Sequence, residues 1–520
     1  MANALQRLQA YGQSVWYDNI SRQLISSGEL KMLIENGVTG ITSNPTIFEK
    51  AISSSGDYDQ DLAALSMRGI SPQTAFEVLA VRDIQDAADL LLPVYERTQY
   101  LDGYVSIEVS PYLAYNTEGT VSEGQSLFKA VGRPNVMIKV PATPEGIPAI
   151  RQLISDGINV NVTLIFAIEM YEKVIDAYIA GIESLIEQGG DPNRVASVAS
   201  FFVSRVDTAI DGILHKKIEN GSTALRDLLG KAAIANARTA YKLFQNEFNS
   251  NKFKILRAQG ARVQRPLWAS TSTKDPNYPD TLYVDALIGP DSVNTMPPAT
   301  IDSFLDHGDP LPSLEGSALV AEKDLKNLSE AGINMTLVTN KLMTDGVELF
   351  ANSYTAVLDS VWGKMCALNG LSDNFKSLGV HYECCQPTLH ALQDNQITKR
   401  IWDMDYTLWS ESAQEISNRL GWLNIVDRIR PLVPEIQQFS KVASNEGFTK
   451  VVLIGMGGSS LGAEVMNQVL GSNNGHLSIL LLDSTNPESI AHIHNSIDID
   501  RTLFIISSKS GETTEIHALY

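Results

Sequence analysis

Short apolar runs with an alternating pattern recur along the first 300 residues of the chain. Eight of them are predicted to be strands, near residues 14–18, 38–43, 104–110, 136–141, 158–164, 197–203, 266–270 and 283–288. Segments with helical periodicity, among them residues 71–97, separate these runs. Eight strands that alternate with helices over this length predict a (β/α)8 TIM barrel, which is an α/β fold.

The alternation within each strand also predicts which side chains point into the barrel. In residues 136–141, Val136, Ile138 and Val140 share one face and leave Lys139 on the inner face. The third strand turns Glu108 inward in the same way. The other inner positions near strand ends are Trp16, Asp18, Asn159, Asn161, Thr163, Ser200 and Phe202, with Arg205 just beyond and Asn44 in the loop after the second strand.

Polar side chains at the carboxyl ends of barrel strands are typical of an active site. A lone lysine in an apolar strand is also explained as an edge-strand or snorkelling residue. Beside carboxylates in an enclosed site, a neutral lysine amine attacks carbonyl groups and forms a Schiff base. The acids then move protons, directly or through a water held by a threonine. The joint occurrence of Asp18, Glu108, Lys139 and Thr163 favours this catalytic interpretation.

Three motifs resemble those of transaldolases and follow the order of that family. They are Gly40-Ile-Thr-Ser-Asn44-Pro-Thr-Ile-Phe48, Val136-Met-Ile-Lys139-Val-Pro-Ala142 and Asn159-Val-Asn-Val-Thr163-Leu-Ile-Phe166. The resemblance spans roughly residues 1–365. It implies a transaldolase of the pentose phosphate pathway, which transfers a dihydroxyacetone unit from sedoheptulose 7-phosphate to glyceraldehyde 3-phosphate. It also implies that the reaction needs no metal and no organic cofactor.

The resemblance further implies roles for individual residues. Lys139 would be the Schiff-base nucleophile, and Asp18 would be the acid/base of carbon–carbon cleavage. Glu108 and Thr163 would hold the catalytic water. The substrate would be bound by Asn44, Asn161, Ser200 and Phe202, and its phosphate by Arg205, Ser270 and Lys274. The segment Trp268-Ala-Ser270-Thr-Ser-Thr-Lys274 departs from the family branch that has arginine at this place, which puts the role of Lys274 in doubt.

A fructose-6-phosphate aldolase is the alternative within the same family, because it shares the barrel and the lysine. Glu108 favours a transaldolase, since the aldolase branch replaces the family's glutamate. From another class, the chain could contain a non-catalytic module that binds sugar phosphates.

A different pattern begins beyond about residue 370. Residues 366–440 are predicted to form a connecting and helical part that precedes the last segment, and residues 441–520 to form an incomplete doubly wound α/β domain. Residues 450–462 run from a strand through a glycine turn into a helix, and residues 503–514 end another strand in a hydroxyl-rich turn. Turns of both kinds bind anions. A dinucleotide site is the rival interpretation, but Gly455-x-Gly457-x-x-Ser460 lacks the third glycine of that fingerprint.

The two turns resemble the sugar-isomerase (SIS) domain of glucose-6-phosphate isomerases. By this resemblance Gly458, Ser459, Ser508, Ser510 and Thr513 would hold a sugar phosphate. The order of the two families is similar to that of bifunctional enzymes in which a transaldolase precedes this isomerase. The catalytic residues of the isomerase are expected beyond Tyr520, so we expect no isomerase activity from residues 1–520.

Composition narrows the set of partners. A net charge of −20 and a pI of about 4.8 argue against nucleic acid and anionic membranes, whereas local positive charge still allows sugar-phosphate substrates. The chain has no long apolar run and no apolar segment at its start, so we expect no membrane span and no signal peptide. Its 3 cysteines form no CxxC pair, which fits a reducing cytoplasm. The oligomeric state does not follow from the sequence.

Overall fold

The computed structural model describes residues 2–368, 385, 387–388, 391–392, 394–414, 416–471 and 477–520. The chain divides into two compact units, Met1–Glu383 and Cys384–Tyr520. We call them the barrel unit and the C-terminal unit and describe each by itself. Within the described ranges, no helix is both long enough and apolar enough to cross a membrane.

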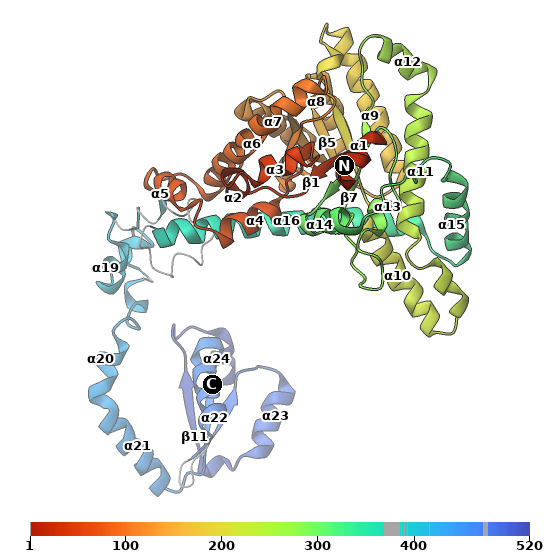
Figure 1. The fold of residues 1–520 in the computed structure, drawn as a ribbon. Helices are drawn as coiled ribbons and strands as arrows, with labels where there is room; N and C mark the ends of the chain where they lie inside the picture. Colours follow the sequence, from red (N-terminus) through yellow and green to blue (C-terminus); the bar gives the residue numbers. More distant parts are fainter. Residues whose placement is uncertain are drawn as a thin grey trace. The chain divides into compact units, whose positions relative to one another are not determined.

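Eight parallel strands close into a barrel in the first unit, as the sequence predicts (Figure 1). They are β1 (Gln13–Tyr17), β2 (Gly40–Ile41), β3 (Val105–Glu108), β4 (Val136–Pro141), β5 (Val160–Ile165), β6 (Ser197–Phe202), β7 (Arg265–Ala269) and β8 (Ser292–Met296). Pairing follows the order of the chain, and β8 pairs with β1 to close the circle. Parallel closure places the carboxyl ends of all eight strands at the same mouth.

Helices connect the strands and surround the barrel. The helices are α1 (Ala4–Ala10), α2 (Arg22–Ser26), α3 (Glu29–Glu35), α4 (Pro45–Ser54), α5 (Asp59–Met67), α6 (Pro72–Arg97), α7 (Thr117–Val131), α8 (Gly146–Ser155), α9 (Ile168–Glu187), α10 (Ser204–Glu219), α11 (Ala232–Phe248), α12 (Asn251–Ala258), α13 (Leu282–Asp285), α14 (Pro298–His307), α15 (Ala318–Glu330) and α16 (Met335–Leu368). Short 3-10 turns are η1 (Pro111–Leu113), η2 (Pro192–Arg194) and η3 (Thr223–Leu228). The expected helix over residues 71–97 is α6.

The position of the eighth strand was wrong in the sequence analysis. Residues 283–288 contain the short helix α13, whose backbone N–H groups at Val284 and Asp285 both bond to the carbonyl of Thr281. The true strand, β8, reads Ser-Val-Asn-Thr-Met and carries three polar residues. Its polar groups bond inside the barrel unit, Thr295 with Thr42 and Asn294 with Thr271. Only these tertiary partners make such a polar strand favourable in a buried place.

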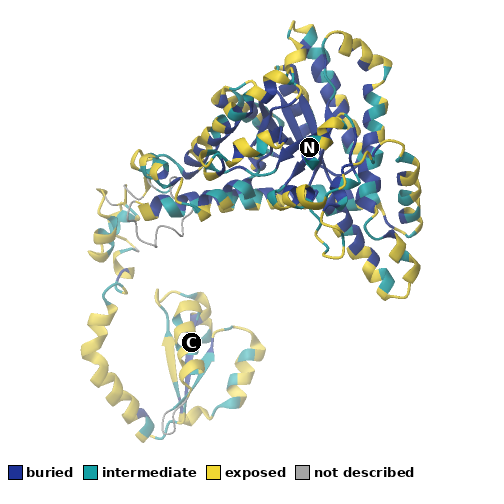
Figure 2. Ribbon diagram, viewed as in Figure 1, coloured by how far each residue is buried: buried dark blue, intermediate teal, exposed yellow. Residues whose placement is uncertain are grey.

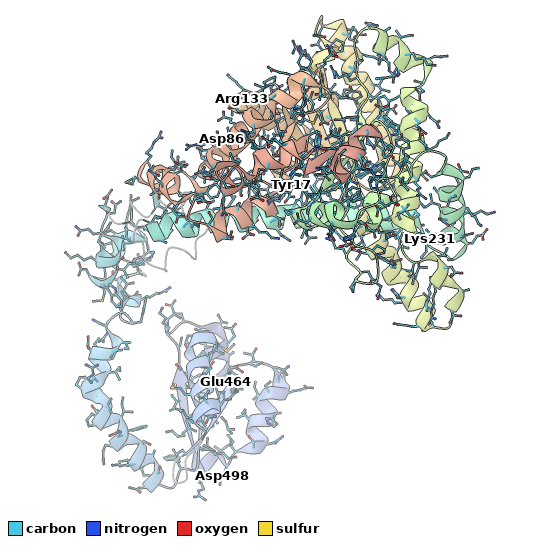
Figure 3. The ribbon with its side chains drawn as sticks, viewed as in Figure 1. Tyr17, Asp86, Arg133, Lys231, Glu464 and Asp498 are labelled. Atoms are coloured by element: carbon cyan, nitrogen blue, oxygen red, sulfur yellow. The ribbon has the colours of Figure 1, made fainter. Side chains whose placement is uncertain are left out.

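The strands of the barrel are almost entirely buried, whereas the outer faces of the helices are exposed (Figure 2). The Trp16 side chain fills space beside Gly40, where even a methyl group would lie within 2.5 Å of the indole ring. The Trp16 indole N–H donates to Asp102 at 2.7 Å, which satisfies its polar group. Charged residues such as Asp86 and Lys231 lie outside, on or next to the surrounding helices (Figure 3).

The last helix of the barrel unit, α16, is a single 34-residue element that follows the final barrel strand (Figure 1). It packs along α4 and also against α5, α6 and α10. The Thr46 hydroxyl of α4 donates to Ser353 of α16 at 2.9 Å, and the hydroxyls of Tyr112 and Thr355 lie 2.6 Å apart. The domain boundary expected at residue 365 stays a prediction. The helix itself continues to Leu368.

The C-terminal unit contains a three-stranded parallel sheet with the order β10-β9-β11. Its elements are α19 (Ile397–Trp402), η5 (Tyr406–Leu408), η6 (Ser417–Arg419), α20 (Ile425–Ile429), η7 (Arg430–Leu432), α21 (Val433–Asn445), β9 (Lys450–Gly455), η8 (Gly457–Ser459), α22 (Leu461–Leu470), β10 (Ser478–Leu482), α23 (Pro487–Ser496), η9 (Ile499–Arg501), β11 (Thr502–Ser507) and α24 (Thr514–Leu519). Strands alternate with helices here, as predicted for a doubly wound domain. The small buried core is formed by Val452, Ile454, Leu482 and Ile516.

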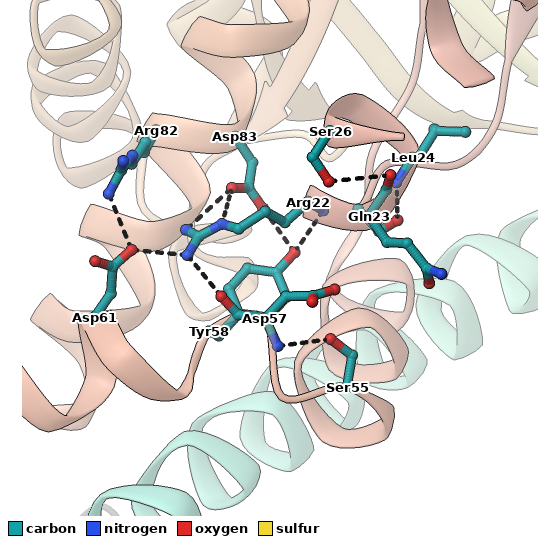
Figure 4. A network of polar contacts seen from close by, with 11 residues as sticks. Arg22, Gln23, Leu24, Ser26, Ser55, Asp57, Tyr58, Asp61, Arg82 and Asp83 are labelled. Atoms are coloured by element: carbon teal, nitrogen blue, oxygen red, sulfur yellow. Dashed lines mark hydrogen bonds and ion pairs between the residues drawn. The ribbon is translucent and has the colours of Figure 1, made fainter. Parts of the chain in front are cut away.

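A polar network ties α2, α5 and α6 together beside the loop that follows β1 (Figure 4). The Arg22 guanidinium donates to Asp83 at 3.3 Å and to Asp61 at 2.7 Å, and it lies over the Tyr58 ring. The Tyr58 hydroxyl donates to the second oxygen of Asp83 at 2.7 Å. The Asp83 side chain is only 1% exposed, so removing it leaves the buried Tyr58 hydroxyl without its acceptor and deprives Arg22 of one of its two carboxylate partners.

We expect Asp83→Ala to lower the free energy of unfolding by about 3 kcal/mol. The substitution breaks the ion pair of the buried Asp83 with Arg22 and leaves the Tyr58 hydroxyl without its acceptor. Urea denaturation followed by tryptophan fluorescence measures this change. Arg82→Ala is the matched control. Arg82 pairs with Asp61 on the surface with 59% of its side chain exposed, so its loss should cost less than about 1 kcal/mol. Equal effects of the two substitutions would contradict this account.

Candidate active site

A cavity of about 740 Å³ opens at the carboxyl ends of the barrel strands. Nine of the residues proposed from the sequence line it: Asp18, Asn44, Lys139, Thr163, Ser200, Phe202, Arg205, Ser270 and Lys274. Glu108 and Asn161 do not line it. The residues come from strands or strand ends that are up to 256 positions apart, from Asp18 to Lys274, so the closed barrel brings them together.

Lys139 lies on β4 with only 5% of its surface exposed. The Lys139 Nζ atom donates to the backbone carbonyl of Ser43 at 3.0 Å. It also lies 3.4 Å from the Glu108 carboxylate, which is the neighbouring position on β3. The apolar residues on either side of Lys139 in β4 are fully buried, which explains why the strand pattern turns the amine toward the cavity.

Asp18 follows β1 and accepts a hydrogen bond of 2.7 Å from the Thr42 hydroxyl. The Thr42 hydroxyl also lies 2.6 Å from that of Thr295. Burial raises the pKa of Asp18 above its ordinary value, while the Thr42 hydrogen bond and the charge of Lys139 oppose this rise. A carboxyl with a raised pKa changes its protonation nearer to neutral pH, which suits a group that transfers protons.

Glu108 and Thr163 each present a buried oxygen that is open to a further hydrogen bond: the Thr163 oxygen has no hydrogen-bond partner among the described residues, and the Glu108 oxygen has the Lys139 amine 3.4 Å away as its ion-pair partner. These atoms are Glu108 Oε2 and Thr163 Oγ1. Burial raises the pKa of Glu108, opposed by the charge of Lys139 and reinforced by that of Asp18. Thr163 lies where the register of β5 against β6 shifts, and the next residue, Leu164, has a φ of 59°. Such an irregularity turns a side chain out of the regular strand pattern, often beside an active site.

The polar residues around this centre are held by internal hydrogen bonds. Asn44 caps α4, because its side-chain oxygen accepts from the backbone N–H of Ile47 at 3.1 Å. The Asn161 side chain donates to Ser106 at 3.0 Å and accepts from Ser200 at 2.7 Å. The Asn161 amide nitrogen and oxygen therefore both have hydrogen-bond partners. This fits a residue that lies behind the cavity wall and orients Ser200, which lines the cavity.

Two cations line the cavity together with a serine cluster. The Arg205 guanidinium lies 5.3 Å from the centre of the Phe202 ring, and burial lowers its pKa. Burial and the charge of Arg205 lower the pKa of Lys274. The Lys274 amine donates to the Ser272 hydroxyl at 2.8 Å. Ser270 has a φ of 57° in the turn after β7, and its hydroxyl lies 2.9 Å from that of Ser204 at the start of α10.

Four residues that the sequence analysis missed also contribute to the cavity: Thr42, Lys50, Thr295 and Phe350. Thr42 lies within the first motif, Gly40–Phe48, so its place near Asn44 was a usable signal. Thr295 lies on the strand that was misplaced. Phe350 comes from α16, far beyond the barrel strands, and no local pattern marks it as a cavity residue.

The two turns of the C-terminal unit follow neighbouring parallel strands. Gly458 and Ser459 follow β9, and Ser508, Ser510 and Thr513 follow β11. The carboxyl ends of parallel strands lie at the same edge of a sheet, so both turns lie at one edge. The Ser508 hydroxyl accepts from the backbone N–H of Gly511 at 3.0 Å and lies 3.1 Å from the Thr513 hydroxyl.

Comparison with known proteins identifies two families along the chain. Residues 15–361 match the Transaldolase/Fructose-6-phosphate aldolase family. Residues 420–518 match the Phosphoglucose isomerase family. The second match covers the sheet of the C-terminal unit and both of its turns, which confirms the resemblance to the isomerase seen in the sequence.

Curated relatives of the barrel unit are transaldolases. "Transaldolase 2" from Nostoc sp. (strain PCC 7120) is 46% identical over 376 residues, which cover 71% of this chain and 99% of the relative. "Transaldolase" from Saccharopolyspora erythraea is 49% identical over 359 residues, 69% of this chain and 96% of the relative. "Transaldolase" from Thermobifida fusca is 47% identical over 369 residues, 71% of this chain and all of the relative.

These similarities cover the strands that carry Asp18, Glu108, Lys139 and Thr163 and support transaldolase activity. Sugar-phosphate substrates fit this family. The fold, the cavity residues and the similar proteins all indicate the same family. The chain belongs to the Transaldolase/Fructose-6-phosphate aldolase family, and a phosphoglucose isomerase-family region follows the barrel.

Proposed function

We propose that the barrel transfers a dihydroxyacetone unit from sedoheptulose 7-phosphate to glyceraldehyde 3-phosphate through a Schiff base on Lys139. The observation that carries this proposal is the position of the Lys139 amine. It is buried, faces the cavity, and lies 3.4 Å from the Glu108 carboxylate. A buried amine beside proton-transfer groups has the arrangement that covalent catalysis on a carbonyl requires.

In this proposal the neutral Lys139 amine attacks the ketose carbonyl carbon and forms a carbinolamine. Loss of water from the carbinolamine gives the iminium. Glu108 Oε2 and Thr163 Oγ1 are suited to hold that water, because Thr163 Oγ1 is buried without a hydrogen-bond partner among the described residues and Glu108 Oε2 is buried with the Lys139 amine as a partner at the long distance of 3.4 Å. Asp18 then takes the proton from the sugar hydroxyl as the carbon–carbon bond breaks, and it returns a proton when the acceptor aldehyde adds.

Positive charge at the cavity wall fits the phosphate of the substrate. We assign this group to Arg205, Lys274 and the Ser270 hydroxyl, because burial lowers the pKa of both partly buried cations and the charge of Arg205 lowers the pKa of Lys274 further. An anion between them relieves this repulsion. The start of α10, at Ser204, adds backbone N–H groups that favour negative charge.

Transaldolase and fructose-6-phosphate aldolase differ in the fate of the three-carbon unit. The aldolase releases free dihydroxyacetone, whereas the transaldolase keeps it bound until an aldehyde arrives. The glutamate at position 108 favours the transaldolase. The proposal includes a place in the pentose phosphate pathway and a cytoplasmic location, with neither nucleic acid nor membrane as a partner.

Lys139→Met should abolish transfer, because the variant keeps the length of the side chain but lacks the nucleophile. Borohydride reduction in the presence of fructose 6-phosphate, followed by peptide mapping, tests this directly. We expect the adduct on Lys139 of the unsubstituted chain and none on the variant. Lys50→Met is the matched control, since Lys50 lines the same cavity, and it should retain the adduct. An adduct on Lys50 or Lys274 would overturn the assignment.

Thr42→Val should move the acidic limb of the kcat profile toward higher pH. Thr42 donates the hydrogen bond that opposes the raised pKa of Asp18, so its removal raises that pKa further and leaves less carboxylate at low pH. Because a hydrogen bond to a charged group contributes about 1.5 kcal/mol or more, we expect roughly a tenfold loss on the acidic side. Thr42→Ser keeps the hydroxyl and should keep the profile. An unchanged limb in Thr42→Val would remove Asp18 from this role.

For the C-terminal unit we propose sugar-phosphate binding at the edge of the sheet where both turns lie. The match of residues 420–518 to the phosphoglucose isomerase family favours this function. The turns supply backbone N–H groups and hydroxyls, and such groups bind phosphate without a cationic side chain.

Ser508→Ala should weaken binding of 6-phosphogluconate by about tenfold or less, the loss of one hydrogen bond to a charged group. This ligand carries a carboxylate in place of a carbonyl and therefore forms no Schiff base in the barrel. Calorimetry on the full chain measures the affinity. Ser496→Ala is the control, because Ser496 ends α23 next to the start of β9, at the opposite end of the sheet. Equal affinity in both variants would exclude the turn as the binding site. In the same preparation we expect no conversion of glucose 6-phosphate to fructose 6-phosphate.

A further inference from the structure

The buried amine of Lys139 has a third neighbour besides Ser43 and Glu108. The Lys139 Nζ atom lies over the ring of Phe350, 5.4 Å from its centre. A cation within about 6 Å of an aromatic face is attracted by the ring's quadrupole, and the attraction grows when both groups are removed from water. Phe350 and Lys139 are each only 5% exposed.

The part of α16 that carries Phe350 is anchored to the barrel by contacts on both sides of this residue. Ser353, one turn further on, is bonded to Thr46 of α4 at 2.9 Å. The neighbouring Tyr354 packs edge-on against Phe76 of α6, with ring centres 5.7 Å apart. On the preceding turn, Gly346 lies against Leu164, the residue after Thr163. These contacts fix the helix backbone that carries the ring at the mouth of the barrel.

The chemistry of the amine distinguishes Phe350 from the two polar neighbours. A ketone and the Lys139 ammonium give an iminium and one water, so the positive charge remains on the same nitrogen. The number of N–H donors falls from three to one. Consequently Ser43 and Glu108 cannot both keep a hydrogen bond to the nitrogen, whereas attraction to the aromatic face needs no N–H at all.

We propose that Phe350 is a positioning residue of this reaction. Its aromatic face attracts the positive charge on the Lys139 nitrogen and thereby favours the cationic iminium over the neutral enamine. The inference rests on the proposed Schiff base at Lys139. Carbon–carbon cleavage converts the iminium into the enamine and passes a proton to the general base. Addition of the acceptor aldehyde regenerates the iminium. Stabilising the cation thus favours the iminium that forms when the acceptor aldehyde has added. It also limits accumulation of the reactive enamine.

The test varies the electrostatics of the ring with little change in its shape. Phenylalanine analogues with one, three and five fluorine atoms replace Phe350 in the full chain, and cyclohexylalanine supplies a ring of similar size without π electrons. Fructose 6-phosphate is the donor. Borohydride traps the iminium, and hexacyanoferrate(III) oxidises the enamine, so the two probes give the ratio of the two forms.

We expect the iminium-to-enamine ratio to fall stepwise with fluorination, by roughly tenfold over the series, and cyclohexylalanine to match the most fluorinated ring. The same series at Phe304, which is buried on α14 outside the cavity, should leave the ratio unchanged. A constant ratio across the Phe350 series, with the adduct still on Lys139, would overturn the inference and leave the proposed function intact. Failure to trap any adduct on Lys139 in the unsubstituted chain would overturn both.

Discussion

The active site depends on keeping a lysine amine inside a barrel strand that is otherwise apolar. Removing an isolated charge from water costs several kcal/mol, so the charged form needs partners close at hand. Here the backbone carbonyl of Ser43 and the Glu108 carboxylate supply them. Glu108 comes from β3, which pairs with β4, and Ser43 comes from the loop after β2, so the closed barrel brings both partners to the amine. The same enclosure raises the pKa values of Asp18 and Glu108, so one physical constraint sets the environment of all three ionisable groups.

The barrel alone does not complete the site. Leu349, Phe350 and Ser353 of α16 line the cavity next to residues from six or more strand ends. Their helix begins after the last barrel strand and is anchored to α4 and α6 by a hydrogen bond and by ring contacts. The helix thereby adds apolar surface and an aromatic ring to a mouth that the strands make polar. This division explains why the cavity has a buried amine on one side and an apolar wall on another.

The two units offer different chemical groups to an anion. In the barrel, Arg205 and Lys274 offer formal charge on side chains, whose partial burial weakens their own charged forms until an anion arrives. In the C-terminal unit, glycine and serine turns after β9 and β11 offer backbone N–H groups and hydroxyls. The first arrangement suits a substrate that must be gripped while bonds break. The second consists of groups that bind phosphate without a cationic side chain.

Strand alternation in the sequence determined the barrel class, the inward direction of Lys139, Glu108 and Thr163, and the strand-turn pattern of residues 450–514, because side-chain direction has a strict period of two in a strand. The motifs around Asn44, Lys139 and Thr163 identified the family, because each motif is a short stretch of sequence that can be read without the tertiary structure. Tertiary structure decided the rest. It placed the eighth strand at β8, whose polar residues Asn294 and Thr295 find their partners only across the barrel. It showed that both ends of the Asn161 amide are occupied beneath the cavity. It also brought Phe350 to Lys139, 211 positions away, and no local pattern specifies a contact between a helix and a strand so far apart in the chain.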